Sequence, residues 1–486
     1  MSTWDSIHLI GPALTLYIGA GVVLLADTVN RGAPARQITL LAIGIAALYA
    51  VWHAMTGSDS TAFSGVVIMD KFALFFAFLL VTVAAAVVIA AGEWAARLEQ
   101  AGEFYALLLT STASMVLLAQ GYDLILIFVA LETTSVAQFI LAGIGRDGRS
   151  SEAGLKYLLT GAVSAAVLLY GFAFLFGLSG TTSLEGIGAY VQSGPEDARL
   201  ALLLAFVLMA AGFGFKMAIV PFHAWVPDVY QGAPTVVTSF LSVASKAAGF
   251  AIVLRVFYVG LGGSDTFISQ DWAVLFGVFA AVSMTFGNVA AILQTDVKRL
   301  LGYSSIAQAG NIAVGLAAVA AGSTTGPSGV LFFLGTYAAT NLGAFIAIIA
   351  ISQRIGSDDI KDYAGLMRRS PWLAGILTLC LLSLTGIPPT AGFLAKIYIF
   401  NSAIQTGENW LVAVVVVAVF NTAISAYYYL RWARTMVMDE PADASGVRVT
   451  APIQGLLALA AVGVLFFGLV PTPLIDAAQR AAGALQ

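Results

Sequence analysis

The chain has 486 residues, of which 59% are hydrophobic and only 10% are charged. Soluble globular proteins carry roughly 25% charged residues, so this composition excludes a soluble protein of this length and indicates an integral membrane protein. The formal net charge of -4 gives no indication of nucleic-acid binding.

Apolar runs long enough to cross the hydrocarbon core, about 20 residues each, recur along the chain. The first should stay in the mature protein, because residues 1–9 lack the basic region of a signal peptide. Fourteen spans are predicted, at 7–28, 37–55, 72–92, 104–119, 122–144, 153–178, 200–230, 235–259, 272–294, 299–322, 327–353, 372–405, 409–437 and 452–470. The sequence therefore predicts an all-α polytopic membrane protein with about fourteen transmembrane helices.

Two of these runs, 200–230 and 372–405, are too long for one straight helix. Each contains proline, at Pro221 and at Pro388-Pro389. Proline removes a helical hydrogen bond, and the membrane tolerates this only where protein or water satisfies the freed carbonyl. The seventh and twelfth helices are therefore predicted to be discontinuous, although the double proline also allows two short spans at 372–405.

Basic residues are divided unequally between the two sets of loops. The loops after odd-numbered spans contain fourteen, namely Arg31, Arg36, Arg97, Arg146, Arg149, Lys298, Arg299, Arg354, Lys361, Arg368, Arg369, Arg431, Arg434 and Arg448. The opposite side has at most four, which are Lys71, Arg199, Arg255 and Arg480. By the positive-inside rule the odd-numbered loops are cytoplasmic, and both termini face the other side.

Four ionisable residues lie deep inside apolar runs: Glu132, Lys216, Lys246 and Lys396. A charge at mid-membrane costs at least about 2.5–3.5 kcal/mol on insertion scales, so these residues need an explanation. A fixed ion pair between Glu132 and one lysine would leave two lysines without an acidic partner. Lys156 lies near the start of its span, where its side chain could simply extend to the interface.

The buried lysines favour a path for protons. An apolar interior makes a lysine easier to deprotonate, and a neighbouring carboxylate opposes this effect, so such groups can exchange protons at working pH. Protonated lysine has no lone pair for a metal cation, and a sodium or calcium site would need several oxygen ligands. The pattern therefore indicates protons, rather than metal cations, as the transported ion.

Other polar residues in these runs have two interpretations. His223, which follows Pro221, can relay protons or can simply meet water at the membrane surface. Gln138, Tyr303 and Ser304 can line a water chain or can join helices by hydrogen bonds. The sequence leaves both interpretations open.

The two helix breaks resemble each other. Residues 220–224 (Val-Pro-Phe-His-Ala) and 387–391 (Ile-Pro-Pro-Thr-Ala) share a pattern at an offset of 167 residues. This offset is about five spans, and an odd number of spans reverses the orientation, so two inverted five-helix repeats are predicted. The predicted divisions are 1–100 for three N-terminal helices, 101–260 and 261–440 for the repeats, and 441–486 for the last helix.

Redox cofactors and metals are not expected in this chain. Cys380 is the only cysteine, whereas an iron–sulfur cluster needs about four thiolates. The three histidines are too scattered for two haems. Neither the GxGxxG nor the GxxxxGK[ST] nucleotide motif occurs.

The segments 212–250, 296–312 and 383–400 resemble signatures of the antiporter-like membrane subunits of respiratory complex I and the related Mrp-type antiporters. The resemblance extends over about 100–440. It implies proton translocation by seven residues: Glu132 paired with Lys216, Lys246 as the central relay, Lys396 on the exit side, and His223, Lys156 and Tyr303 as assisting groups.

Within this family, the chain resembles the branch with lysine on helices 8 and 12 (Lys246 and Lys396) and without a long lateral C-terminal helix. The resemblance implies a hetero-oligomer with other complex I membrane subunits and lipids in a bacterial inner membrane. FMN, iron–sulfur clusters and quinone would belong to partner subunits. The alternatives are a subunit of an Mrp-type cation/proton antiporter or membrane-bound hydrogenase, and a solute transporter whose lysines bind an anion.

Overall fold

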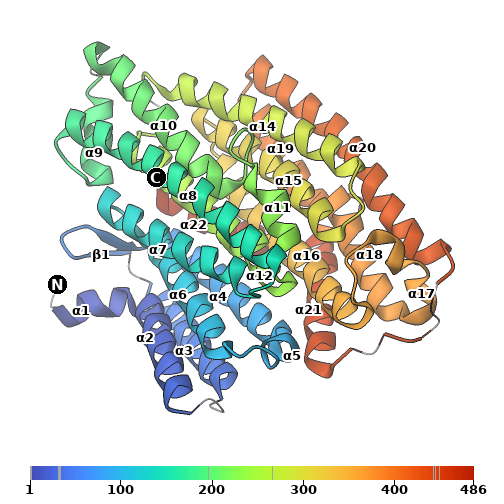
Figure 1. The fold of residues 1–486 in the computed structure, drawn as a ribbon. Coiled ribbons are helices and arrows are strands. Elements are labelled where there is room, and N and C mark those ends of the chain that lie inside the picture. The colour runs from blue at the N-terminus through green and yellow to red at the C-terminus, as the bar shows by residue number, and fades with distance from the viewer. Residues whose placement is uncertain are drawn as a thin grey trace.

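The computed structural model describes residues 3–30, 34–57, 59–194, 196–264, 266–441, 443, 445–447 and 449–485. These residues form a bundle of helices with one small hairpin (Figure 1). In this described part, twelve helices are long and apolar enough to cross a membrane. Arg31 and Arg448, which contribute to the predicted orientation, lie outside the described residues.

The helices match the predicted spans. The helices and strands are α1 (Thr3–Leu9), α2 (Gly11–Val29), α3 (Ala35–Thr56), β1 (Ser60–Ala62), β2 (Val67–Met69), α4 (Lys71–Ala90), α5 (Gly92–Ala95), α6 (Ala101–Gln120), α7 (Leu124–Gly143), α8 (Gly148–Ser179), α9 (Leu184–Gln192), α10 (Arg199–Met217), α11 (Trp225–Gly232), α12 (Thr235–Phe240), α13 (Lys246–Arg255), α14 (Ser269–Ile292), α15 (Val297–Ala320), α16 (Gly326–Ile355), α17 (Leu366–Arg369), α18 (Pro371–Thr385), α19 (Ala391–Ile404), α20 (Asn409–Met438), α21 (Ala451–Leu469) and α22 (Thr472–Ala482).

Several helices begin at an aspartate. The side chains of Asp70, Asp123, Asp147 and Asp296 each accept a hydrogen bond from a backbone N–H in the first turn of α4, α7, α8 and α15. The first N–H groups of a helix have no partner within the helix, and aspartate is a preferred residue to supply one. These caps set where four of the helices enter the bundle.

Both predicted helix breaks are confirmed. Helix α10 ends at Ala218, whose φ of 62° is left-handed, and α11 resumes at Trp225. Helix α18 ends at Gly386, with a φ of 90°, and α19 resumes near Ala391. A left-handed residue ends the helical hydrogen-bond ladder, and glycine adopts this conformation without a steric cost. The run 372–405 thus consists of two half-helices.

The predicted span 235–259 is one buried helix whose backbone departs twice from α-helical geometry. Two π-helical stretches, Leu241–Ser245 and Val256–Gly260, flank α13. Such stretches are rare and are found frequently at functional sites. Lys246 directly follows the first of them, so the helix geometry changes where a buried charge occurs.

The short peripheral elements have no counterpart among the predicted spans. The strands β1 and β2 form an antiparallel hairpin, and α1, α5, α9, α17 and α22 are too short or too polar for a span. Helix α22 returns from the last span to pack against α4 and α16. These elements lie at the ends of the transmembrane helices.

Candidate functional site

Lys216 is buried at the end of α10 and is 5% exposed. Its Nζ donates to Oε1 of Gln138 on α7 over 3.3 Å. The same oxygen accepts hydrogen bonds from Ser245 Oγ at 2.9 Å and from Tyr157 OH at 3.2 Å. Gln138 therefore joins α10, α8 and the residue that precedes Lys246.

Glu132 lies on α7 with its side chain partly exposed. It lines a small cavity together with Ser135, Ser164 and Lys216. It also lines an open groove on the outer face of α6 and α7. In the described part of the chain no ion pair of 4 Å or less joins Glu132 to Lys216. The structure thus brings the predicted pair to one cavity without direct contact.

Lys246 is 2% exposed and occupies the middle of the site. Its Nζ donates to the backbone carbonyl of Ser305 on α15. Ser305 Oγ in turn lies 3.3 Å from the hydroxyls of Tyr230 and Tyr337. The ammonium also lies 5.7 Å from the centre of the Tyr337 ring, within the range of a cation–π interaction.

Lys396, which is 6% exposed, follows the second helix break. Its Nζ donates to the Thr385 carbonyl at 2.8 Å, which the break at Gly386 leaves outside the helical ladder, and to Thr422 Oγ1 at 3.3 Å. It lines a narrow cavity with Gln308 and Tyr337. Tyr337, whose ring lies close to Lys246, is thus also part of the wall beside Lys396.

Together these groups form a polar axis through the apolar core, in which some neighbours are joined by hydrogen bonds and others share a cavity or are adjacent in the chain. It contains Glu132, Lys216, Gln138, Ser245, Lys246, Ser305, Tyr337, Gln308 and Lys396. Carbonyl and amide oxygens accept hydrogen bonds from a lysine in either protonation state, because the neutral amine still carries N–H groups. Both states of each lysine therefore have a partner here.

Lys156 belongs to an ion-pair network at one end of the protein. Its Nζ lies 2.8 Å from Glu152 Oε1 and 2.7 Å from Asp228 Oδ2. Asp228 also binds Arg299 Nη1 at 2.7 Å, so the network links α8, α11 and α15. With its side chain 44% exposed, Lys156 has the reach to the surface that the interfacial interpretation requires.

A polar cavity of about 580 Å³ opens beside this network and is lined by Gln231, Asp296 and Asp358, among others. Gln231 bridges Arg299 at 3.0 Å and Asp296 at 3.3 Å. Burial raises the pKa of the Asp296 carboxyl above its usual range. The cavity and the network thus place groups that can bind and release protons between the surface and α11.

His223 and Tyr303 have aromatic rings and Arg299 among their neighbours. The His223 ring packs against Phe286 with 4.6 Å between ring centres, and its buried Nδ1 has no hydrogen-bond partner among the described residues. The Tyr303 ring lies 5.9 Å from the Arg299 guanidinium carbon. Within the described part of the chain, none of the hydrogen bonds at Lys216 and Lys246 involves either residue.

Substitution of Gln138 tests its central position. Gln138→Leu removes the oxygen that accepts hydrogen bonds from three donors. It is expected to lower the rate of proton transport about tenfold, which is less than the effect of removing a group that itself transfers the proton. Gln138→Glu, which keeps the acceptor, should retain more activity. Proton uptake by vesicles measures both. Gln454→Leu, on the exposed face of α21, is the control, and equal transport by both leucine variants would contradict the role.

Comparisons with known proteins agree with this architecture. The family model described as NADH:quinone oxidoreductase/Mrp antiporter, TM, matches residues 121–422. NADH-quinone oxidoreductase subunit N of Dehalococcoides mccartyi is 40% identical over 479 residues, which cover 97% of this chain and 98% of that protein.

Two solved structures share the fold. A chain of respiratory complex I from Thermus thermophilus superimposes with a TM-score of 0.80 at 32% identity, covering 96% of this chain and 98% of its own. A chain of the Mrp complex from a Dietzia species gives a TM-score of 0.84 at 20% identity, covering 100% and 98%. The latter likeness concerns the fold alone.

Proposed function

Because the chain belongs to the NADH:quinone oxidoreductase/Mrp antiporter membrane family, we propose that it is the N-type proton-translocating subunit of a bacterial NADH–quinone oxidoreductase. The polar axis that brings these buried lysines together is the observation that carries this proposal. Its lysines on α13 and α19, Lys246 and Lys396, are those expected of this branch. NADH oxidation and quinone reduction take place in partner subunits, which carry FMN, iron–sulfur clusters and quinone.

The proton path uses the axis in steps. A change of charge near Glu132 alters the electrostatic interaction with Lys216 in the shared cavity. A change of about 1.4 kcal/mol in this interaction is enough to shift the lysine pKa by one unit and so to change its protonation. Gln138 and Ser245 link Lys216 to the central relay at Lys246, and Ser305 and Tyr337 link Lys246 to Lys396. Each lysine gains or loses a proton while its hydrogen-bond acceptor stays in place.

The peripheral groups supply and orient the path. Lys156 and Asp228 exchange protons with water in the polar cavity beside Asp296. His223 and Tyr303 assist proton transfer near the first helix break. The separation of Gln138 from Ser305 is 167 residues, the same as that of Pro221 from Pro388. This agreement supports the assignment of 101–260 and 261–440 as inverted repeats.

The distribution of basic residues supports the orientation. The loops rich in Arg and Lys face the cytoplasm of the bacterial inner membrane, and both termini face the periplasm. Other membrane subunits of the complex pack beside this chain. The open groove at Glu132 places that carboxylate where a neighbouring subunit can change its surroundings.

The direct test replaces the two charges of the first cavity. Glu132→Gln and Lys216→Met, in the assembled complex, are expected to lower NADH–quinone activity and proton pumping together by about tenfold or more, as for a proton-transfer group. Lys361→Met is the control, because this side chain is 77% exposed.

The outcomes separate the alternatives. Full pumping in both variants would contradict the proton path. Loss of sodium-dependent proton exchange in vesicles, without any NADH dependence, would instead indicate an Mrp-type antiporter or a hydrogenase subunit. Uptake of a labelled anion by the chain alone would indicate a solute transporter.

A further inference from the structure

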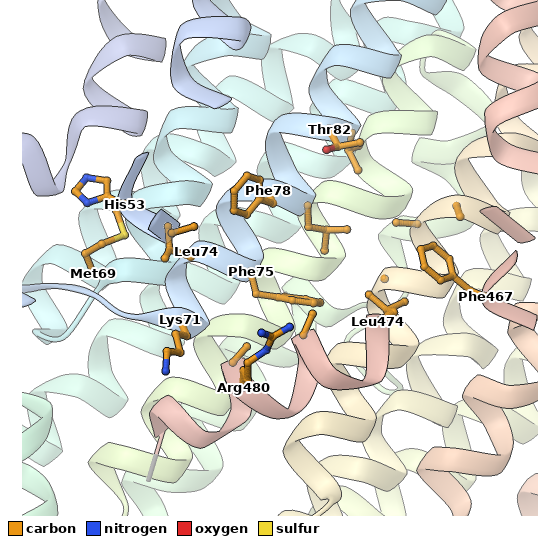
Figure 2. A pocket seen from close by; sticks show the side chains of 18 of the residues that line it. His53, Met69, Lys71, Leu74, Phe75, Phe78, Thr82, Phe467, Leu474 and Arg480 are labelled. Carbon is orange, nitrogen blue, oxygen red and sulfur yellow. The ribbon is translucent and has the colours of Figure 1, made fainter. Parts of the chain in front are cut away.

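A large cavity lies outside the polar axis, between α3, α4, α16, α21 and α22. Its volume is about 720 Å³. Its walls are mostly apolar and include Phe75, Phe78 and Leu79 of α4, Leu342 of α16 and Phe467 of α21. Figure 2 shows Phe75, Phe78 and Phe467 around the space, with α22 crossing beneath it.

Two cations line one end of this cavity. Lys71 is the first residue of α4, and Arg480 projects from α22 toward Phe75 (Figure 2). His53 and Asp59 line the same cavity. With one acidic group against two cationic side chains, this end of the cavity carries a net positive charge.

The sequence places at most four cations on the side of the membrane where Lys71 lies. In the described part of the structure, two of these cations form ion pairs and two do not. Arg199 pairs with Asp271 at 3.0 Å, and Arg255 pairs with Asp70 at 2.5 Å. Lys71 and Arg480 form no ion pair of 4 Å or less within the described part of the chain. The two cations without a carboxylate partner therefore line the same cavity, which indicates an anionic ligand.

The depth of the cavity fits one leaflet. Thr82, which also lines it, lies eleven positions after Lys71 on the same helix. Eleven positions at 1.5 Å each give about 16 Å along α4. Half of a hydrocarbon core of about 30 Å is about 15 Å. The cavity thus extends from the membrane surface at Lys71 to the middle of the bilayer.

We propose that this cavity binds one anionic glycerophospholipid from the leaflet on the side of Lys71 and Arg480. The phosphate lies between the two cations, where a guanidinium can donate two parallel hydrogen bonds and an ammonium acts as a point charge. One acyl chain follows α4 past Phe75 and Phe78 toward Thr82. The lipid fills the space between α4 and α22 and links the C-terminal helix to the bundle.

Native mass spectrometry of the tagged full-length chain in detergent tests this site. The chain is titrated with phosphatidylglycerol or with phosphatidylcholine, and bound lipids are counted. Wild-type chain should bind one phosphatidylglycerol about tenfold more tightly than phosphatidylcholine, as expected for a charge-assisted contact. The double variant Lys71→Gln/Arg480→Gln should lose this preference.

Two further variants separate the headgroup from the acyl chain. Thr82→Phe fills the deep end while both cations remain, and it should weaken binding of phosphatidylglycerol. Arg199→Gln removes a cation from the same side but outside the cavity, and binding should stay within about twofold. Equal binding of both lipids by wild-type chain overturns the proposal, and so does unchanged phosphatidylglycerol binding by the double variant.

Discussion

Replacing Lys246 with methionine is expected to reduce proton pumping by about tenfold to a hundredfold, the range for loss of a positioned proton-transfer group. Methionine keeps the apolar stem of the side chain but has no proton to exchange. Lys246 is the middle group of the axis, because its Nζ donates to the Ser305 carbonyl and its chain neighbour Ser245 donates to Gln138. Its loss therefore interrupts both halves of the path. Vesicles that contain the complex, with a pH-sensitive dye, measure the rate.

Lys246→Arg separates a relay from a fixed charge. Arginine stays protonated at any working pH, so it supplies charge and hydrogen bonds but cannot release a proton. A relay predicts that Lys246→Arg pumps as poorly as Lys246→Met while the complex assembles normally. Wild-type pumping by the arginine variant would contradict the relay and would leave Lys246 a structural role.

Much of the fold could be predicted because lipid imposes strong rules on the sequence. Hydropathy located the transmembrane helices, twelve of which in the described part of the chain are long and apolar enough to cross a membrane, and the proline residues at 221 and 388–389 located both helix breaks. The cost of a buried charge also singled out Lys216, Lys246 and Lys396, all of which are buried. These signals are strong because each violation costs several kcal/mol.

The partners of the lysines could not be predicted in the same way. Lys246 and Lys396 donate to backbone carbonyls of Ser305 and Thr385, and a backbone carbonyl leaves no signature in a sequence. Gln138 was visible as a polar residue after Glu132, but a glutamine inside a span more commonly joins helices. Only the structure, in which Lys216, Tyr157 and Ser245 all donate to its amide oxygen, shows which role the glutamine has.

The buried pair Asp70–Arg255 was missed for a related reason. Both residues lie near the ends of predicted spans, where a charge usually meets water, so the sequence places Arg255 with the surface cations. In the structure Arg255 is 0% and Asp70 1% exposed. The guanidinium donates two hydrogen bonds to the Asp70 carboxylate and one, at 2.8 Å, to the Ala119 carbonyl. The pair therefore joins α4, α6 and α13 beneath the surface.

Asp70→Asn is expected to lower the free energy of unfolding by about 3–5 kcal/mol, because it leaves the buried guanidinium of Arg255 without a counter-charge. Asparagine retains the cap of α4, since its side-chain oxygen can still accept from the N–H of Ala73. The loss thus reports the charge rather than the cap. Chemical denaturation of the chain in micelles, followed by circular dichroism, measures the difference.

Two comparisons make this result specific to the ion pair. Asp123→Asn also changes a capping aspartate, that of α7, but Asp123 has no cationic partner within 4 Å among the described residues, so its loss should stay near 1 kcal/mol or below, roughly the value of a cap. Adding Arg255→Met to Asp70→Asn removes the unpaired charge and should restore most of the stability, because apolar replacements of a buried pair are often neutral. If the double variant is as unstable as Asp70→Asn, then the stabilisation comes from packing around Arg255 and not from its charge.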